Sequence, residues 1–328
     1  MRFLCLSFCL LLLSCAPHAR EQDQDDKVHY FGPAAAAKEG AAAKDGAPVA
    51  EDSPGQIVEP AGTPAARAES AATRRDASLS DDLFTRTGGS DWPRFLGPTG
   101  DSKSTERGIL TQWPPAGPPM VWHQRTGVGF GMPTISRGRL FQIARFGDQA
   151  RLSCQKSETG EPLWKFEYTT DYVDLYNYDN GPRCSPIVDG DRVYTFGAEG
   201  MLHCVRVADG QPLWKADTAR QFGVVQNFFG VGSTPVIEGD LLIAQIGGSP
   251  PEDQETPPGQ LDRVHGNGSG VVAFDKFSGE VKYKLSDELA SYAGPALATI
   301  DGRRWCFVLQ TSRMHAPCAD FQAAKAIS

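Results

Sequence analysis

Oxygen-bearing side chains crowd one short stretch of the sequence, TTDYVDLYNYDNGP at residues 169–182. Carboxylate and amide oxygens are the ligands that calcium prefers in proteins, so this stretch has the chemistry to hold that ion. The spacing matches no EF-hand loop, and an acidic loop that faces solvent has the same composition, so we favour a solvated loop. The five candidate ligands are Asp171, Asp174, Asn177, Asp179 and Asn180.

The histidines and cysteines form no metal-binding or catalytic site that the sequence can assign. None of the six histidines stands at a metal-binding spacing, and no Ser/His/Asp or Cys/His set can be assigned. Cys154 and Cys204 occupy the same place in successive repeats, which holds them too far apart for a disulfide, so we expect small buried hydrophobic residues there. For Cys184, Cys306 and Cys318 the sequence does not decide between a disulfide and a free thiol. The sequence therefore predicts no catalytic residue and no metal ligand.

Composition bounds the fold and the partners. The chain has 328 residues and a formal net charge of −8, and no basic stripe runs through it, so we expect no nucleic-acid partner. Its 35 glycines and 24 prolines are too many for a helical protein and indicate many turns and short strands.

Residues 1–15 have the pattern of an export signal. Arg2 precedes the apolar run FLCLSFCLLLL, which is too short to span a membrane as a mature helix. The run ends in LLSC, which resembles a bacterial lipobox, so Cys15 would be acylated and would anchor the chain to a membrane. An ordinary signal peptide cleaved nearby is the alternative, but no A-x-A site occurs. We expect an exported protein, periplasmic or at the outer membrane, with a lipid anchor at Cys15.

Residues 16–88 contain few large apolar side chains and are rich in Ala, Pro, Gly and charge. Such a segment cannot bury enough apolar surface to offset the entropy of ordering. We interpret it as a disordered tether between anchor and domain.

From residue 129 a unit of about fifty residues recurs, which is the length of one propeller blade. Each unit begins with a small-residue and proline lead-in, continues through an Asp-Gly or Arg-Gly turn into an alternating strand, and ends with two further strands. With no intervening helices, this predicts an all-β fold: a β-propeller of four-stranded antiparallel blades, about three complete and part of a fourth. The lead-ins are GFGMPTI, PRCSPIV, GVGSTPVI and SYAGPALA.

Each of the first three units repeats a small residue, a turn glycine and an aromatic residue at fixed spacing. The aromatic residue stands four positions after the glycine, and the small residue stands six positions before the glycine. Because a single sheet cannot cover its own faces, we expect these positions to dock neighbouring blades. The three sets are Cys154, Gly160 and Trp164; Cys204, Gly210 and Trp214; and Ala273, Gly279 and Tyr283.

This pattern resembles the PQQ-like repeat of the quinoprotein alcohol dehydrogenase-like propellers, A-[LF]-D-x-x-[TS]-G-x-x-x-W, best matched by AFDKFSG at 273–279. In that family the Ala, Gly and Trp form the docking set between blades. The chain departs from it with cysteine for alanine in two repeats, with Lys156 and Arg206 where aspartate is usual, and with Tyr283 in place of one tryptophan. DWPRFLGPTGD at 91–101 and the later PPMVWHQRTG also resemble the lead-in of exported bacterial propellers. The resemblance covers residues 91–310.

The repeat stops matching after RRWCFVLQTSR. We therefore assign 89–310 to a partial propeller and 311–328 to an atypical tail. Propellers of this family usually have seven or eight blades, and the segment PMVWHQRTG resembles the strand that closes the last one. We expect a truncated product or, alternatively, a half-propeller that another chain completes, because open blade edges favour association.

Two lead-in loops, YVDLYNYDNGPR and QFGVVQNFFGVG, hold equivalent places in consecutive repeats, so the propeller geometry would bring them to one face. Together they could bind a peptide or glycan. The alternative is that their rings simply cover the mouth of the core, and we favour that alternative. The candidate residues are Tyr176, Asn177, Tyr178, Arg183, Asn227, Phe228 and Phe229.

The resemblance implies two functional classes. The favoured one is a non-enzymatic scaffold or binding module of the cell envelope, similar to the BamB family of outer-membrane assembly lipoproteins, with an envelope protein, peptide or glycan as partner and no cofactor. The alternative is a PQQ-dependent dehydrogenase that needs quinone and calcium, although the adjacent cysteine pair of such enzymes does not occur here. A non-functional fragment of either class is the third possibility.

Overall fold

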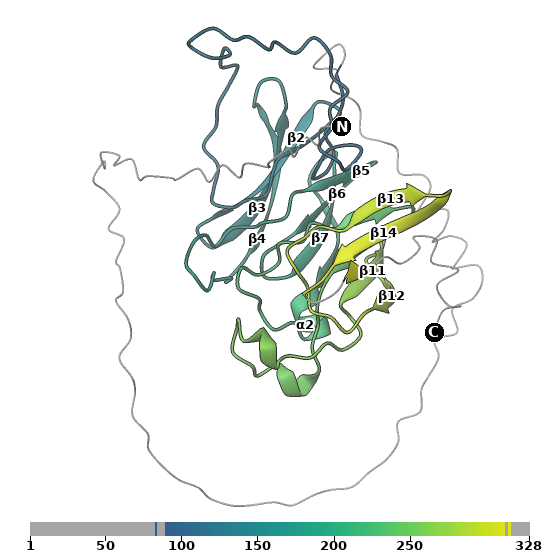
Figure 1. Cartoon of the computed structure of the whole chain (residues 1–328). Coiled ribbons are helices and arrows are strands. Elements are labelled where there is room, and N and C mark those ends of the chain that lie inside the picture. Colours follow the sequence, from purple (N-terminus) through teal and green to yellow (C-terminus); the bar gives the residue numbers. More distant parts are fainter. Residues whose placement is uncertain (1–82, 84–88, 312–313, 316–328) are drawn as a thin grey trace, which may run out of the picture. The chain divides into compact units, whose positions relative to one another are not determined.

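The computed structural model describes residue 83, residues 89–311 and residues 314–315. Within them the strands form separate antiparallel sheets in which spatial order follows chain order, and we call these sheets blades 1 to 4 (Figure 1). The expected all-β propeller of four-stranded blades is confirmed for the first three. Blade 1 consists of β1 (Thr134–Ser136), β2 (Arg139–Phe146), β3 (Gln149–Lys156) and β4 (Pro162–Thr169).

Blades 2 and 3 repeat this meander. Blade 2 consists of β5 (Ile187–Asp189), β6 (Arg192–Phe196), β7 (Met201–Arg206) and β8 (Pro212–Asp217). Blade 3 consists of β9 (Val236–Glu238), β10 (Leu241–Gln245), β11 (Val271–Asp275) and β12 (Val281–Leu285).

Blade 4 consists of β13 (Ala296–Ile300), β14 (Arg303–Leu309) and β15 (Met314–His315). β15 pairs with β14 through Leu309↔Met314 and Val308↔His315. The sequence placed no third strand here, because MHAPCADF lacks the turn and the aromatic of the repeat. Two backbone pairs are nonetheless made within the segment that was assigned to an atypical tail.

The turns follow the local sequence. Between β1 and β2, Arg137 and Gly138 have φ of 48° and 75°, and between β13 and β14, Asp301 and Gly302 have φ of 50° and 75°. Two consecutive residues at positive φ close a type I′ hairpin, whose twist matches the flanking strands. The Arg-Gly and Asp-Gly pairs thus serve the turns that the repeat predicted.

A β-bulge recurs in the outermost strand of each complete blade, where one residue has no partner on the third strand. The register shifts after Cys154, Cys204 and Ala273, directly beyond the pairs Cys154↔Trp164, Cys204↔Trp214 and Ala273↔Tyr283. Each small residue therefore lies opposite the aromatic residue of the outermost strand, which leaves room for the large ring.

The hydrophobic cores lie between neighbouring blades. Phe141 and Leu152 of blade 1 pack with Val193 and Val205 of blade 2 in one buried cluster. A second cluster joins blades 2 and 3, and a third joins blades 3 and 4, where Cys306 is fully buried. Each sheet thus covers its faces with its neighbours, as a repeat architecture requires.

Two features differ from a purely β meander. A five-residue helix, α2 (Thr218–Phe222), follows β8; Asp217 caps it by accepting a hydrogen bond from the Arg220 amide at 3.0 Å. Buried Thr218 and Phe222 hold this helix in place, since so short a helix is not stable alone.

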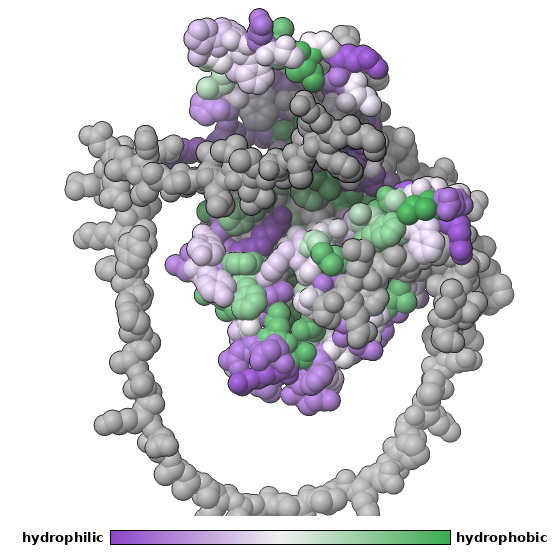
Figure 2. Space-filling model, in the orientation of Figure 1, coloured by the Kyte–Doolittle hydropathy of each residue, from purple (hydrophilic) through white to green (hydrophobic). Residues whose placement is uncertain are grey.

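Residues 247–270, an insertion that lengthens the third repeat, contain two short 3₁₀ helices, η1 (Pro251–Asp253) and η2 (Leu261–Arg263). The insertion follows α2 and β10 as a strongly hydrophilic lobe at the bottom of the view (Figure 2). The Asn267 side chain donates to the Phe222 carbonyl of α2 at 2.9 Å and to the Ser249 carbonyl near the start of the insertion at 3.0 Å, which joins the two ends of the insertion to this helix.

The predicted signal at 1–15, the lipidation site Cys15 and the tether, apart from Leu83, lie outside the described residues, as does Cys318. In the part of the chain that the structure describes, no helix has the length and apolar character needed to cross a membrane.

Candidate functional site

Trp164 of β4 and Trp214 of β8 each pack on a glycine of the next blade. A Cβ atom on Gly210 would lie 2.5 Å from Trp164, and one on Gly279 would lie 2.7 Å from Trp214. The indole Nε1 of Trp164 donates to the Val207 carbonyl at 2.9 Å, and that of Trp214 donates to the Lys276 carbonyl at 2.9 Å. These contacts join blade 1 to blade 2 and blade 2 to blade 3.

Trp122 makes the same contact from outside the sheets. A Cβ atom on Gly160 would lie 2.8 Å from the Trp122 ring, and Trp122 Nε1 donates to the Ser157 carbonyl at 3.0 Å. Ser157 holds the place in blade 1 that Val207 holds in blade 2. The segment that resembles a closing strand therefore docks on blade 1 through its tryptophan, although it pairs with no strand there.

The small residues of the docking sets are buried and Trp164 is half-buried. Cys154 and Cys204 are 1% and 0% exposed and unpaired, and burial raises the pKa of each thiol to about 12, so both act as small apolar residues. Cys184 and Cys306 are likewise free and buried. Tyr283 packs against the cluster that joins blades 3 and 4.

Hydrogen bonds also join the lead-in segments of successive blades. The Met132 amide donates to Ser185 Oγ at 3.0 Å, and the Ser185 amide donates to Thr234 Oγ1 at 3.2 Å. Ser233 Oγ continues the chain by donating to the Ala293 carbonyl at 2.9 Å. Because these segments are tied to one another, the loops that precede them are held in fixed relative positions.

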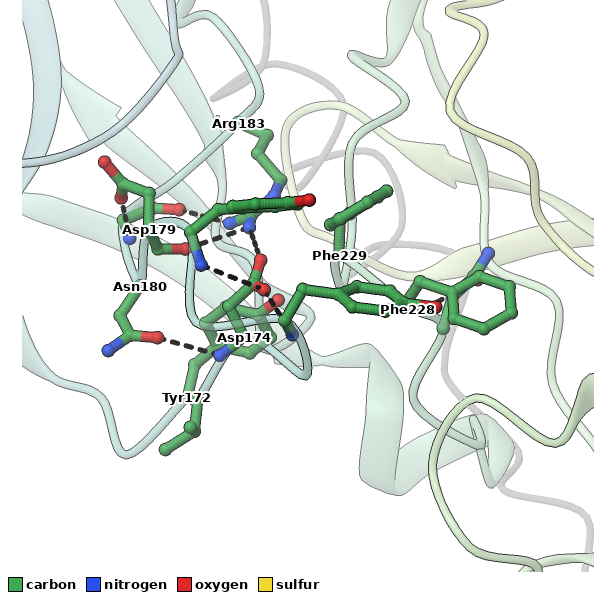
Figure 3. Close-up of polar contacts among 12 residues, drawn as sticks. Tyr172, Asp174, Asp179, Asn180, Arg183, Phe228 and Phe229 are labelled. Atoms are coloured by element: carbon green, nitrogen blue, oxygen red, sulfur yellow. Dashed lines mark hydrogen bonds and ion pairs between the residues drawn. The ribbon is translucent and has the colours of Figure 1, made fainter. Parts of the chain in front are cut away.

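Those loops bring five rings together, which we call the aromatic surface: Tyr176, Tyr178, Phe228, Phe229 and Tyr292. Tyr178 stacks on Tyr176 and on Phe229, with ring centroids 6.0 and 6.1 Å apart. Phe229 also contacts the ring of Tyr292 at 5.5 Å, and its amide donates to the Tyr292 hydroxyl at 2.9 Å. Figure 3 shows Phe228 and Phe229 extending toward the loop that carries Asp174 and Asp179.

These rings are not a buried lid of the core. Tyr178 is 74% exposed, Tyr176 55%, and Phe228 and Tyr292 somewhat over a third. Of the four rings that were expected over the mouth of the core, Tyr176, Tyr178 and Phe228 therefore keep a large part of their surface in solvent. Tyr292 was missed as a member, because SYAGPALA was assigned only as a strand lead-in.

A buried ion pair fixes the loop that carries Tyr176 and Tyr178 (Figure 3). The Arg183 guanidinium pairs with the Asp174 carboxylate, and these side chains are 9% and 0% exposed. Asp174 Oδ1 also accepts from the Tyr176 amide at 2.8 Å, and the Arg183 guanidinium donates to the Asp179 carbonyl at 2.9 Å. Asp174 is thus an internal support, and its assignment to a solvated loop was wrong.

The remaining predicted loop residues shape the backbone. Asn177 has φ of 55°, a conformation that asparagine tolerates better than most residues. The Asn227 side chain donates to the Ala290 carbonyl at 3.3 Å and accepts from the Phe228 amide at 2.7 Å. Of the predicted binding residues, Arg183 and Asn227 therefore position the rings.

The described residues form no carboxylate cluster for the calcium ion that the dehydrogenase alternative requires. Among them no three histidine, cysteine, aspartate or glutamate side chains converge as ligands of one ion. The Asp174 oxygens are occupied by Arg183 and by loop amides. We therefore derive no reaction step through a quinone.

Comparisons with known proteins agree with the repeat. The family model described as outer membrane protein assembly factor BamB matches residues 104–301. No curated protein sequence matches the chain.

Solved structures are similar only at low identity. BamB from Moraxella catarrhalis is 14% identical, with 55% of this chain and 45% of that chain covered and a TM-score of 0.33. Quinohemoprotein alcohol dehydrogenase from Comamonas testosteroni is 17% identical, with 80% and 34% covered and a TM-score of 0.40. The chain thus spans less than half the length of either. On the extent of the family match, this chain belongs to the PQQ-like repeat family of outer membrane protein assembly factor BamB.

Proposed function

We propose that this chain is a non-enzymatic binding module of the cell envelope, and that the aromatic surface holds an extended segment of an envelope polypeptide. Membership of a family named for outer membrane protein assembly supports the envelope and the polypeptide partner. Export and a lipid anchor at Cys15 are part of the same proposal, supported by the signal-like sequence at 1–15.

The observation that carries the proposal is the exposed, pre-arranged set of rings. Tyrosine and phenylalanine give large contact area at little entropic cost, and they dominate binding energy at protein interfaces. Here the rings contact one another, and the Asp174–Arg183 pair fixes their loop, so little ordering is needed on binding. Val173 and Leu175, which are 59% and 41% exposed, add apolar area to the same loop.

Fluorescence anisotropy with the full chain tests this function. The probe is a labelled twelve-residue peptide of alternating phenylalanine and lysine, compared with a labelled chito-oligosaccharide. We expect the peptide to bind, and the double variant Tyr178→Ala/Phe228→Ala to lose at least about tenfold in affinity.

Trp113→Ala is the matched control, because Trp113 is 60% exposed and lies outside the aromatic surface. Its affinity should equal that of the parent chain. Binding of the sugar alone would assign the surface to glycans instead, and equal losses in the control and the double variant would contradict a role for these rings.

A further inference from the structure

A cavity of about 400 Å³ opens beside the aromatic surface. Asn227 and Ser291, which directly precede Phe228 and Tyr292 in the chain, line it. Tyr172 and Val173 line it from the loop that carries Tyr176 and Tyr178. A ligand held by the rings would therefore reach the cavity without a change of the fold.

The charge of this cavity has one sign. Asp171 and Glu199 line it, and no lysine, arginine or histidine belongs to its walls. Glu199 accepts hydrogen bonds from the Tyr168 hydroxyl at 2.8 Å and from Thr170 Oγ1 at 3.1 Å. Among the described residues no cation pairs with it. A partly buried carboxylate without a counter-charge is costly, and a bound cation would remove that cost.

A second polar group in the wall has no partner of its own. Tyr172 is 4% exposed, and its hydroxyl makes no hydrogen bond within the described structure. Buried hydroxyls are almost always bonded in folded proteins, so we expect this one to take a polar partner when a ligand fills the cavity. A hydroxyl oxygen has lone pairs that accept a hydrogen bond from an ammonium group, and a carboxylate adds a stronger, charge-assisted one.

Part of the cavity wall is apolar. Val224, Val231 and Ile246 line the cavity, and Val224 and Val231 pack against the core between blades 2 and 3. A lysine side chain combines a stem of four methylene groups with a terminal ammonium. Its stem matches this wall, and its head matches Glu199 and Tyr172.

We propose that the cavity binds the side chain of a lysine from the bound polypeptide, with the stem on Val224, Val231 and Ile246 and the ammonium at Glu199. This inference deepens the proposed function, on which it rests for the identity of the partner. The cavity's preference for an alkylammonium group can nevertheless be measured without any peptide, so the two can fail separately.

The affinity of the cavity for an ammonium group should change with pH in a defined direction. Burial raises the pKa of Glu199, whereas a lysine-type ammonium keeps its proton to about pH 10.4. The affinity should therefore rise with pH as Glu199 loses its proton. The titratable groups around it are Asp171, Tyr168, Tyr172, Cys184 and, behind Tyr168, His203.

Most of these groups do not titrate in the range of the measurement. Burial raises the pKa of Tyr168, and it raises those of Tyr172 and Cys184 to about 12. Burial lowers the pKa of His203 to about 4, and the Arg183 guanidinium lies over the face of the Tyr172 ring. Asp171→Asn removes the remaining carboxylate, so the pH series is also run in that variant.

Titration of the full chain with n-butylammonium, followed by calorimetry between pH 5 and 8, tests the proposal. Affinity should increase with pH in the parent chain and in Asp171→Asn. Glu199→Gln, which keeps the hydrogen bonds with Tyr168 and Thr170 in reach, should weaken binding at pH 8 by at least about tenfold. Tyr172→Phe should weaken it severalfold.

Glu255→Gln is the matched control, because it removes an exposed carboxylate that does not line the cavity and should leave the affinity unchanged. n-Butanol, which has the stem without the charge, should bind at least about tenfold more weakly than the ammonium. Equal affinity of Glu199→Gln and the parent chain, or a response to calcium with none to n-butylammonium, would overturn the proposal. Binding of n-butylammonium without binding of the peptide would contradict the proposed function and leave the ammonium site in place.

Discussion

The Trp164 indole occupies the space in which a side chain on Gly210 would lie, and its Nε1 donates to the Val207 carbonyl three residues before that glycine. The contact recurs between Trp214 and Gly279 and between Trp122 and Gly160. The near-identical phrases ETGEPLWK and ADGQPLWK thus serve two purposes. The glycine accepts the ring of the preceding segment, and the tryptophan docks on the next blade.

Substituting Gly210 with alanine should destabilise the chain by about 2–4 kcal/mol, because the new methyl group meets Trp164 at 2.5 Å and φ is 76°. Gly302 has nearly the same φ, 75°, and no atom within 4 Å of a Cβ. Gly302→Ala should therefore cost only the backbone strain, about 1 kcal/mol. Urea unfolding of both variants measures the difference, and equal losses would show that Trp164 does not restrict the site.

Trp164→Phe keeps a ring on Gly210 but removes the donor to the Val207 carbonyl. The free energy of unfolding should fall by about 1–3 kcal/mol, because a buried acceptor loses its partner. Trp113→Phe, at a 60% exposed position, should change it by less than about 0.5 kcal/mol. Chemical denaturation followed by far-ultraviolet circular dichroism compares them, and an unchanged Trp164→Phe would mean that this hydrogen bond is not part of the docking.

Asp174→Asn should be among the most damaging substitutions near the aromatic surface. It leaves the Arg183 guanidinium buried without a counter-charge, which costs about 3–5 kcal/mol. In the Lys156–Glu161 pair, whose Nζ and Oε2 atoms are 2.6 Å apart, the side chains are 34% and 57% exposed. Glu161→Gln should therefore cost under about 1 kcal/mol. Thermal melting of the two variants tests this contrast, which fails if both shift the midpoint equally.

His203 should make the chain sensitive to acid. Its side chain is buried between blades 1 and 2 against Tyr168, and burial lowers its pKa to about 4 from an unfolded value near 6.5. Between these values the unfolded chain binds the proton more strongly, so stability is present above pH 6.5 and is lost as the pH falls toward 4. The loss is about 3 kcal/mol.

Unfolding free energies of the parent chain and of His203→Phe, measured from pH 7 to pH 4.5, check this slope. Glu199 works in the opposite direction, because its raised pKa makes stability fall as the pH rises through that value. The comparison is therefore made in a Glu199→Gln background. Parallel pH profiles with and without His203 would rule out its part in acid sensitivity.

The blades were predictable because their signals are local and periodic. The hairpin at Arg137–Gly138, the bulge beside Cys154 and the Trp–Gly spacing all follow from neighbouring residues. Helix α2 was not predicted, since a five-residue helix depends on the tertiary contacts of Thr218 and Phe222.

The candidate site was only partly predictable. Tyr176, Tyr178, Phe228 and Phe229 were found because two loops hold equivalent places in the repeat. Tyr292 lies in the next lead-in, SYAGPALA, which carries no second aromatic residue to mark it, and Glu199 lies in a tight turn with no motif around it. From the sequence, Asp174 was expected to be exposed because it is acidic. Only the fold shows that Arg183 lies beside it and that the two form a buried ion pair.

The most direct test of the account is where a bound peptide lies on the chain. A phenylalanine–lysine peptide that carries a benzophenone group, irradiated with the full chain and mapped by mass spectrometry, should label residues 170–183, residues 223–232 and Tyr292. Labels that gather instead on the outer strands β4 and β8, with none on the aromatic surface, would contradict it.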